Sequence, residues 1–313
     1  MKYFKNQKCD FKYPVITMGT FDGVHLGHQK LLKILSRKAK EKNGEAVVIT
    51  YFHHPLETIH RKTFPYLLTE KDRKEKLLKK FGADCVIYLN FDDKMAEMLP
   101  EQFLLDILIN EIHAREMVIG YDTHFGKERK GNFQFLKKNE EKFGFQVDLI
   151  EPLKIHNRIV SSSLIRDLIR EGNMQEVSKF LGRNYSLSGL VIKGHRIGRD
   201  IGFPTINIQP FDPHKLIPAI GVYISEIFVN SNKYIGVTNI GYSPTLKKIS
   251  IKEVETNIID FQGDLYDKKV EIVFHKRLRE ELLFTSKTEL VDAIQNDVEK
   301  ARRYFGMLLK HPV

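Results

Sequence analysis

Through the first part of the chain, short apolar runs alternate with longer segments whose apolar residues recur at helical spacing. The segment before Ala46 places Leu31, Leu35 and Ala39 on one helical face. Thr69 to Asp72 predicts a further helix start, and Pro100 another. The runs typical of buried strands are Val15–Ile16, Ala46–Tyr51, Cys85–Leu89, Met117–Gly120 and Phe145–Ile150. This alternation predicts an α/β domain with a parallel sheet covered by helices.

The pattern of apolar residues along the chain changes after residue 182. Short strand-like runs follow one another there, separated by turn residues and without helix-length patterns between them. Those runs are Leu187–Ile192, Val222–Val229, Tyr234–Val237, Thr256–Ile259 and Val270–Phe274. Such a succession predicts a closed antiparallel barrel, and the apolar period from Leu290 to Phe305 predicts a C-terminal helix. We therefore expect two domains, residues 1–182 and 183–313.

Length and charge agree with two domains that handle anionic ligands. A chain of 313 residues exceeds the usual size of one core. It carries 50 Lys and Arg against 40 Asp and Glu, a net charge of +10 that is not gathered into a tail. A nucleic-acid binder more often shows a basic stripe with interleaved aromatics. We therefore expect phosphate-bearing small molecules as partners, no nucleic acid, and a monomer or weak oligomer.

The cysteines and the N-terminal sequence narrow the class of protein further. Cys9 and Cys85 lie far apart and form neither a disulfide framework nor a zinc pattern. The first residues, Met-Lys-Tyr-Phe-Lys, lack an apolar core of signal-peptide length, and no stretch approaches a membrane span. These features predict a cytoplasmic protein that does not enter membranes.

The most informative motif directly follows the first apolar run. Residues 17–28 read Thr-Met-Gly-Thr-Phe-Asp-Gly-Val-His-Leu-Gly-His. His25 and His28 are three apart, so they share one face of a helix that begins near Gly27. The glycines permit close approach of the backbone to a ligand, and a helix N-terminus favours phosphate. The window predicts a nucleotide site with these candidates: Gly19, Phe21, Asp22, Gly23, His25, Gly27 and His28.

Other polar segments of the first domain are expected at the same rim of the sheet. They are His53 with His54, Asp122 within Gly120–Gly126, and Ser162 with Arg166 in the stretch Ser-Ser-Ser-Leu-Ile-Arg at 161–166. Positioning and positive charge suffice for attack on an α-phosphate, without a covalent nucleophile. Ordinary roles remain open for each segment: loop histidines, a turn at the aspartate, and a serine helix cap.

At these residues the chain resembles the histidine-signature nucleotidyltransferases, and more closely the adenylyltransferase module of prokaryotic bifunctional riboflavin kinase/FAD synthetases. The family motif Gly-x-Phe-Asp-Gly-x-His-x-Gly-His is matched from Gly19 to His28. A Ser-Ser-Thr-x-Ile-Arg motif is matched at 161–166, with Ser163 in place of threonine. The resemblance implies a Rossmann-like parallel-sheet nucleotidyltransferase domain.

The resemblance also implies roles for single residues of this domain. It implies that His25 and His28 contact ATP phosphates, and that Ser162 and Arg166 help to hold the triphosphate. Asp122 is implied as a flavin-binding residue. The family's Asp-Phe-x-Phe-Gly is here Asp-Thr-His-Phe-Gly at 122–126, so the missing aromatic leaves flavin stacking open.

A second glycine-rich motif opens the second domain. Residues 194–207 read Gly-His-Arg-Ile-Gly-Arg-Asp-Ile-Gly-Phe-Pro-Thr-Ile-Asn. Gly194, Gly198 and Arg199 predict a flexible, basic phosphate loop. Thr205 and Asn207 are two apart, so their side chains point the same way in an extended segment. Together with phosphate oxygens and waters, a hydroxyl and an amide carbonyl suit Mg²⁺.

This string resembles the riboflavin kinase signature, with Gly-Arg-x-x-Gly-Phe-Pro-Thr-x-Asn intact. Further matches to that family lie at 218–223, 239–245 and 255–266. The resemblance implies an antiparallel β-barrel riboflavin kinase domain followed by a C-terminal helix. It implies that Glu255 is the general base, that Thr205 and Asn207 hold Mg²⁺, and that Arg279 lies near the flavin. From the residues alone, Glu255 and Arg279 also suit a solvated surface.

The function implied by both resemblances is the synthesis of flavin cofactors. The chain would phosphorylate riboflavin with ATP to give FMN, then adenylylate FMN with a second ATP to give FAD and pyrophosphate. Three alternatives remain: a chain with only one active module, a nucleotidyltransferase for another phosphorylated alcohol, and a nucleotide- or RNA-binding regulator. The last predicts salt-sensitive nucleic-acid binding and no turnover.

Overall fold

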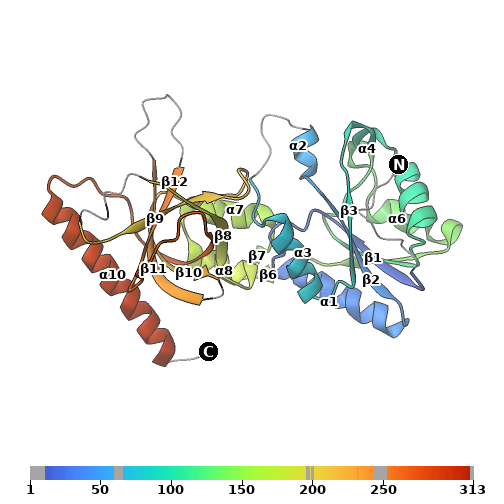
Figure 1. Cartoon of the computed structure of the whole chain (residues 1–313). Helices are drawn as coiled ribbons and strands as arrows, with labels where there is room; N and C mark the ends of the chain where they lie inside the picture. Colours follow the sequence, from blue (N-terminus) through green and yellow to red (C-terminus); the bar gives the residue numbers. More distant parts are fainter. Residues whose placement is uncertain are drawn as a thin grey trace. The chain divides into compact units, whose positions relative to one another are not determined.

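The chain divides into two compact units, Met1–Ser162 and Ser163–Val313, which Figure 1 draws as ribbons. The computed structural model describes residues 11–59, 66–194, 198, 201–230, 232–242 and 252–310. Residues 307–310 are described by their backbone alone. Of the predicted site residues, Arg199 lies outside the described residues.

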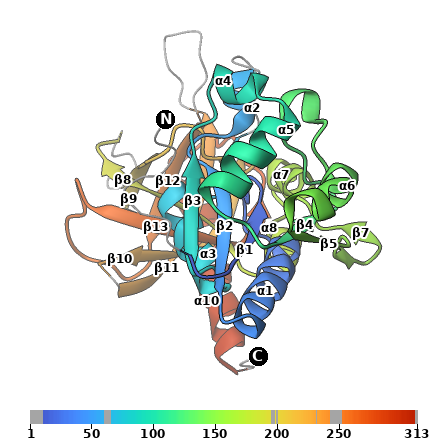
Figure 2. The same cartoon turned by 90° about the vertical axis from the view of Figure 1, so that its right-hand side faces the viewer.

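A five-stranded parallel sheet forms the centre of the first unit, in the order β3-β2-β1-β4-β5. Figure 2 shows these strands side by side. Their bounds are β1 Pro14–Met18, β2 Glu45–Tyr51, β3 Cys85–Leu89, β4 Glu116–Gly120 and β5 Gln146–Ile150. Strands β2 and β3 are added in turn on one side of β1, and β4 and β5 are added on the other side of β1. The carboxyl ends of β1 and β4 therefore form a topological switch point, where open α/β sheets bind ligands.

Helices cover both faces of this sheet, and the alternation of strand side chains explains why. Ile16 of β1 belongs to the same core cluster as Phe103 and Leu104, whereas its neighbour Val15 belongs to a second cluster with Leu32 and Leu35. The main helices are α1 Leu26–Glu41, α3 Lys71–Lys80, the π-helix η1 Phe103–Glu111 and α6 Phe133–Phe143. Shorter elements are α2 Pro55–Ile59, α4 Asp93–Glu97, α5 Pro100–Gln102, the 3₁₀ helix η2 Lys127–Arg129, β6 Lys154–Ile155 and β7 Arg158–Ile159. The parallel α/β fold predicted for this part of the chain is confirmed.

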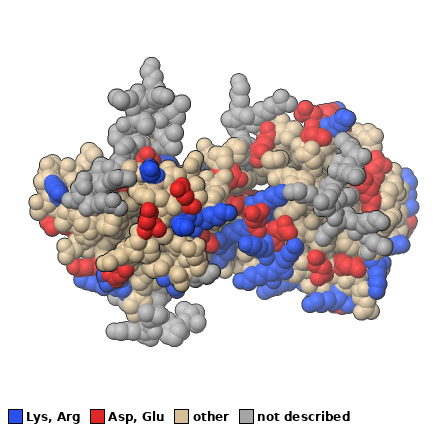
Figure 3. All heavy atoms as spheres, viewed as in Figure 1, with Lys and Arg blue, Asp and Glu red and all other residues tan. Residues whose placement is uncertain are grey.

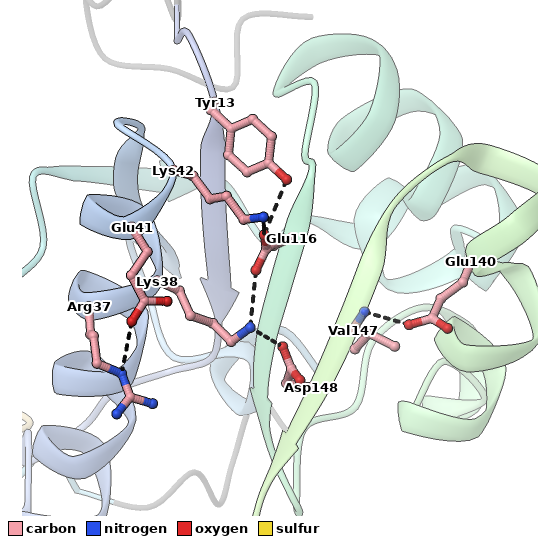
Figure 4. A network of polar contacts seen from close by, with 9 residues as sticks. All are labelled: Tyr13, Arg37, Lys38, Glu41, Lys42, Glu116, Glu140, Val147 and Asp148. Carbon is pink, nitrogen blue, oxygen red and sulfur yellow. Dashed lines mark hydrogen bonds and ion pairs between the residues drawn. The ribbon is translucent and has the colours of Figure 1, made fainter.

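A buried carboxylate fixes the end of the sheet that lies away from the sequence motifs (Figure 4). Glu116, the first residue of β4, accepts a hydrogen bond from the Tyr13 hydroxyl at 3.1 Å. It also pairs with Lys38 at 3.1 Å and with Lys42 at 3.8 Å. Lys38 in turn pairs with Asp148 at 2.8 Å, and this hydrogen bond is the main reason why the pKa of Lys38 is raised. The network ties the C-terminal end of α1 to β4, to β5 and to Tyr13, the residue before β1.

A closed six-stranded antiparallel barrel forms the centre of the second unit, in the order β10-β11-β12-β9-β8-β13. Pairing of β13 with β10 closes it. Its strands are β8 Tyr185–Ile192, β9 Thr205–Pro210, β10 Gly221–Val229, β11 Asn232–Tyr242, β12 Lys252–Ile258 and β13 Lys269–Arg279. Three buried hydroxyls, those of Ser225, Thr238 and Thr256, bond one another at 2.7 and 2.9 Å across β10, β11 and β12. The predicted antiparallel barrel is confirmed.

Among the described residues, helices α7, α8 and α10 accompany the barrel. The long C-terminal helix α10, Lys287–Lys310, was expected; its Ala301 and Phe305 pack with Val222 and Ile224 of β10. Helices α7 Ser162–Glu171 and α8 Met174–Leu181 precede the barrel, and α8 packs on β8 and β13. For this reason the division between units lies before the boundary at residue 182, which remains a prediction. Among the described residues, no helix combines the length and apolar character needed to cross a membrane.

Candidate active sites

The chain turns sharply between β1 and α1. The φ angles of Phe21, Gly23 and Val24 are 49°, 88° and 39°. These positive values are uncommon for residues other than glycine. Phe21 and Val24 are buried, and this packing holds the turn in place. Strain that is held by surrounding structure is frequent where a backbone is shaped to meet a ligand.

Both predicted histidines lie at the N-terminus of α1. His25 is the residue before the helix, and its Nδ1 accepts the His28 backbone N–H at 3.3 Å. Their rings are stacked with centroids 3.6 Å apart, and the Phe21 ring lies 5.0 Å from that of His28. A Cβ at Gly27 would come within 3.2 Å of the His25 ring, so glycine permits this arrangement. With no acidic residue in its first turn, the helix end offers an anion its N–H groups and positive dipole end.

Asp22 and Ser162 hold the same turn in place by hydrogen bonds to backbone groups. The buried Asp22 carboxylate accepts the backbone N–H groups of Leu68 at 3.0 Å and Thr69 at 3.1 Å. The Ser162 hydroxyl donates to the Asp22 backbone carbonyl at 2.8 Å. The structure therefore brings the two predicted residues together and gives both a positioning contact. Arg166 is buried on α7, in the second unit.

Lys74 is a cation at this site that the sequence analysis did not single out. It projects from α3, and its amino group lies within hydrogen-bond distance of Thr20, Thr50 and Tyr51. Burial lowers the pKa of Lys74 to about 8. A signal was present in the sequence, because Lys74 lies three and four residues before Leu77 and Leu78 and thus on the apolar face of its helix.

The loop after β4 carries Asp122 at the other side of the switch point. Asp122 is exposed, and its carboxylate lies 3.1 Å from where a Cβ of Gly120 would be. Thr123 closes the loop by accepting the Gly120 N–H at 3.1 Å. The His124 ring contacts the Asp122 carbonyl at 2.9 Å and the Arg129 guanidinium at 3.2 Å. The loop thus presents an exposed carboxylate, and the His124 ring and the Arg129 guanidinium hold its backbone.

The two histidines after β2 take part in local contacts. His53 is exposed and lies 3.5 Å from the Glu57 carboxylate. The His54 ring accepts the Leu56 backbone N–H at 3.2 Å, which organises the start of α2. These contacts match the ordinary roles that the sequence left open for them.

In the barrel, the predicted base and the predicted metal ligands lie on two adjacent strands. Asn207 of β9 is paired with Glu255 of β12, and Thr205 with Asn257. Paired residues of antiparallel strands project on the same face, so these four polar side chains share one surface. The Thr205 hydroxyl donates to the Glu255 carboxylate at 2.5 Å, and the Asn257 amide donates to the Pro204 carbonyl at 2.8 Å.

Two glycines of the loop before β9 allow backbone to lie against this surface. A Cβ at Gly194 would be 1.9 Å from the Asn207 amide nitrogen. A Cβ at Gly198 would be 2.4 Å from the Phe203 carbonyl and 3.1 Å from the Thr205 hydroxyl. The glycines are therefore required for close packing beside the two predicted ligands.

Arg279, at the end of β13, is held by the C-terminal helix. Its guanidinium contacts the Asp297 carboxylate through Nε at 2.9 Å and Nη2 at 2.8 Å. Asp297 is buried, so this pair ties α10 to the barrel. The contact fixes the position of the guanidinium at the strand end, and its role toward a flavin remains a prediction.

Basic side chains of the first unit gather where α1 and α3 lie, as the blue spheres of Figure 3 show. Helix α3 alone reads Lys-Asp-Arg-Lys-Glu-Lys-Leu-Leu-Lys-Lys. Acidic side chains are interspersed with them on the face that Figure 3 shows, so this face carries no continuous basic stripe. This distribution suits small anionic ligands.

Comparison with known proteins identifies the family. The family model for FAD synthetase matches residues 8–164, and that for riboflavin kinase matches residues 181–305. A bifunctional riboflavin kinase/FMN adenylyltransferase from Buchnera aphidicola is 36% identical over 299 residues, 94% of each chain. The chain belongs to the bifunctional riboflavin kinase/FMN adenylyltransferase family. A relative of the same name from Bacillus subtilis is 33% identical over 300 residues, covering 95% of this chain and 94% of its own.

A solved structure is similar over the same extent. The crystal structure of a macrolide-efflux protein from Streptococcus pneumoniae superposes with a TM-score of 0.84 and 29% sequence identity, covering 93% of this chain and 94% of that one. Within the riboflavin kinase/FMN adenylyltransferase family, the site residues from Gly19 to Ser162 fall in the first match and those from Gly194 to Arg279 in the second. Arg166 falls between the two matches, and the roles of single residues remain predictions.

Proposed function

We propose that this chain makes FAD from riboflavin in two ATP-dependent steps, one in each unit. The barrel unit transfers the γ-phosphoryl group of ATP to the ribityl hydroxyl of riboflavin and releases ADP. The α/β unit joins the FMN phosphate to the adenylyl group of a second ATP and releases pyrophosphate. The main support is that two separate polar arrangements, around His25 with His28 and around Glu255, lie in separate units.

For adenylyl transfer, an oxygen of the FMN phosphate attacks the α-phosphorus of ATP as its bond to pyrophosphate breaks. The reaction needs alignment of two anions and stabilisation of their charge, and no covalent enzyme intermediate. His25 and His28 supply donors at the N-terminus of α1, where the helix dipole is positive. Gly19, Gly23 and Gly27 let the turn approach the phosphates.

For phosphorylation of riboflavin, Glu255 acts as the general base. It takes the proton of the ribityl hydroxyl as that oxygen attacks the γ-phosphorus and ADP leaves. The Thr205 hydroxyl orients the carboxylate by its 2.5 Å hydrogen bond. The strand register pairs Asn207 with Glu255, which supports a base beside residues that would meet the phosphates.

The side chains beside Glu255 fit a Mg²⁺ ion. Thr205 and Asn207 present a hydroxyl and an amide oxygen on one face, and Mg²⁺ prefers oxygen ligands with several waters or phosphate oxygens. Gly194 and Gly198 leave backbone, without side chains, against these two residues. Bound Mg²⁺ would neutralise charge on the phosphates during transfer. Thr205 and Asn207 would hold it.

Two further residues are assigned to flavin binding. Asp122 is exposed on the loop after β4, where the sheet has its switch point. Arg279 is fixed by Asp297 at the end of a barrel strand. The substrates riboflavin, FMN and ATP are small molecules, and the proposal has the chain act on them as a monomer or a weak oligomer without nucleic acid.

Product analysis tests the proposal. The purified chain is incubated with riboflavin, ATP and MgCl₂, and the flavins and adenine nucleotides are separated over time. FMN and ADP should form first, followed by FAD and pyrophosphate, and added RNA should change neither rate. FMN as the final product would leave only the kinase active. No turnover together with salt-sensitive RNA binding would replace the proposal with a regulator.

A further inference from the structure

Lys74 joins three parts of the first unit at one amino group. Its Nζ lies 3.3 Å from the Thr20 carbonyl in the turn after β1 and 3.3 Å from the Thr50 hydroxyl on β2. It lies 3.4 Å from the Tyr51 carbonyl at the end of β2. An ammonium group has three N–H donors, so it can serve all three acceptors, whereas a neutral amine has two.

The Thr20 carbonyl is the centre of this arrangement. It accepts from Lys74 and also from the Thr50 hydroxyl, at 3.1 Å. Thr20 lies between Gly19 and Phe21, inside the turn that leads to His25 and His28. The Gly19 N–H bonds the Ile49 carbonyl at 3.0 Å, so the turn is attached to β2 at two successive residues.

Charged and aromatic groups from neighbouring elements face the amino group. The Asp22 carboxylate, in the turn, favours its protonated form, and the Lys71 ammonium, on α3, disfavours it. The Tyr88 ring of β3 has its centroid 5.6 Å from the Nζ. Burial outweighs these contributions and lowers the pKa of Lys74 to about 8. The ammonium form, with its third donor, is therefore lost as the pH rises through about 8.

We propose that Lys74 is a positioning residue for adenylyl transfer: its ammonium group holds the Thr20 carbonyl against the end of β2 and so sets the turn that carries His25 and His28. This inference rests on the proposed adenylylation of FMN in the first unit. The adenylylation rate should therefore fall above pH 8, while riboflavin phosphorylation in the barrel should lack this alkaline loss.

Three variants test the assignment. Lys74→Met removes the charge and all three donors, and Lys74→Arg keeps a cation whose protonation persists beyond pH 12. Lys79→Met is the matched control, because Lys79 lies on the same helix, is exposed, and pairs only with the neighbouring Glu75 among the contacts found for its side chain in the described residues. For each variant, kcat and KM for FMN adenylylation are measured from pH 6 to 10. Riboflavin phosphorylation and thermal unfolding are measured on the same samples.

Lys74→Met should lower kcat for adenylylation at pH 7 by about 30-fold or more, since a turn displaced by about 1 Å costs up to about 100-fold. Riboflavin phosphorylation should stay within about twofold of the unchanged chain. Lys74→Arg should restore part of the rate and lose the fall above pH 8. Lys79→Met should change neither activity.

Three results would overturn the role of Lys74. They are adenylylation by Lys74→Met within about threefold of the unchanged chain, equal loss of both activities, and an arginine variant with the same alkaline fall. If Lys74→Met does not fold, the pH profile of Lys74→Arg decides. An unchanged chain that forms no FAD from FMN would instead contradict the proposed function.

Discussion

Gly194 provides a sharp test of the barrel site, because one added methyl group there would collide with Asn207. A Cβ at residue 194 would lie 1.9 Å from the Asn207 amide nitrogen, whereas ordinary contact begins at 3.4 Å. The loop or the Asn207 side chain must therefore move by about 1.5 Å. A displacement of about 1 Å can cost about 100-fold in rate where reacting groups must be aligned. We expect Gly194→Ala to slow riboflavin phosphorylation by about 100-fold.

The assay is formation of FMN from riboflavin and ATP, with conversion of added FMN to FAD by the same sample as internal control. FMN adenylylation should be unchanged, because Gly194 lies in the second unit. Gly306→Ala serves as the matched glycine control: a Cβ there meets no described atom within 4 Å, and alanine favours helix α10. Phosphorylation by Gly194→Ala within about threefold of the unchanged chain would refute the assignment of Asn207 to the site.

Two further predictions concern carboxylates held by hydrogen bonds, Glu226 in the barrel and Asp22 in the first unit. The Glu226 carboxylate accepts from His275 at 2.9 Å and pairs with Lys233 at 2.8 Å, and chiefly the His275 hydrogen bond lowers its pKa to about 2. The ionised Glu226 carboxylate therefore stabilises the fold fully above about pH 4.5, and this stabilisation is lost as the pH falls through about 2. Glu226→Gln should lower the unfolding free energy by up to about 3 kcal/mol at pH 7. The variant's unfolding free energy should also depend less on pH in the acid range. Asp22→Asn puts an N–H₂ donor where backbone N–H groups need acceptors, so the unfolding free energy should fall by about 1–3 kcal/mol. The substitution should slow adenylylation more than it slows phosphorylation. An unfolding curve with the same acid dependence in Glu226→Gln, or equal rates for Asp22→Asn and the unchanged chain, would contradict these expectations.

Most of the fold could be predicted because its elements have strong local signals. The five apolar runs of the first unit correspond to β1 to β5, since parallel strands buried on both faces read as continuous hydrophobic stretches. Strand β9 was not among the predicted runs. It follows Pro204 in a glycine-rich string, and its pairing with β8 and β12 gives it a strand conformation that its own composition only weakly favours.

The candidate sites were predictable where chemistry follows from local spacing, as for His25 and His28 at the start of α1. Contacts between distant segments were not predictable in this way. The register that sets Thr205 against Glu255 depends on barrel closure, which the composition of neither strand encodes. The spacing of Lys74 from Leu77 and Leu78 was a weak signal, because lysine in a charged helix is usually solvated. Tertiary packing brings its amino group to the Thr20 and Tyr51 carbonyls, and that contact could not be predicted from local sequence.

The central claim, two independent sites in one chain, is tested most directly by mixing two variants. Glu255→Gln should adenylylate added FMN but form no FMN from riboflavin, and His28→Ala should do the reverse. Supplied with riboflavin, ATP and MgCl₂, neither variant alone should make FAD, and an equimolar mixture should make it, because FMN released by one is used by the other. FAD from either variant alone, or none from a mixture in which FMN accumulates, would contradict the account.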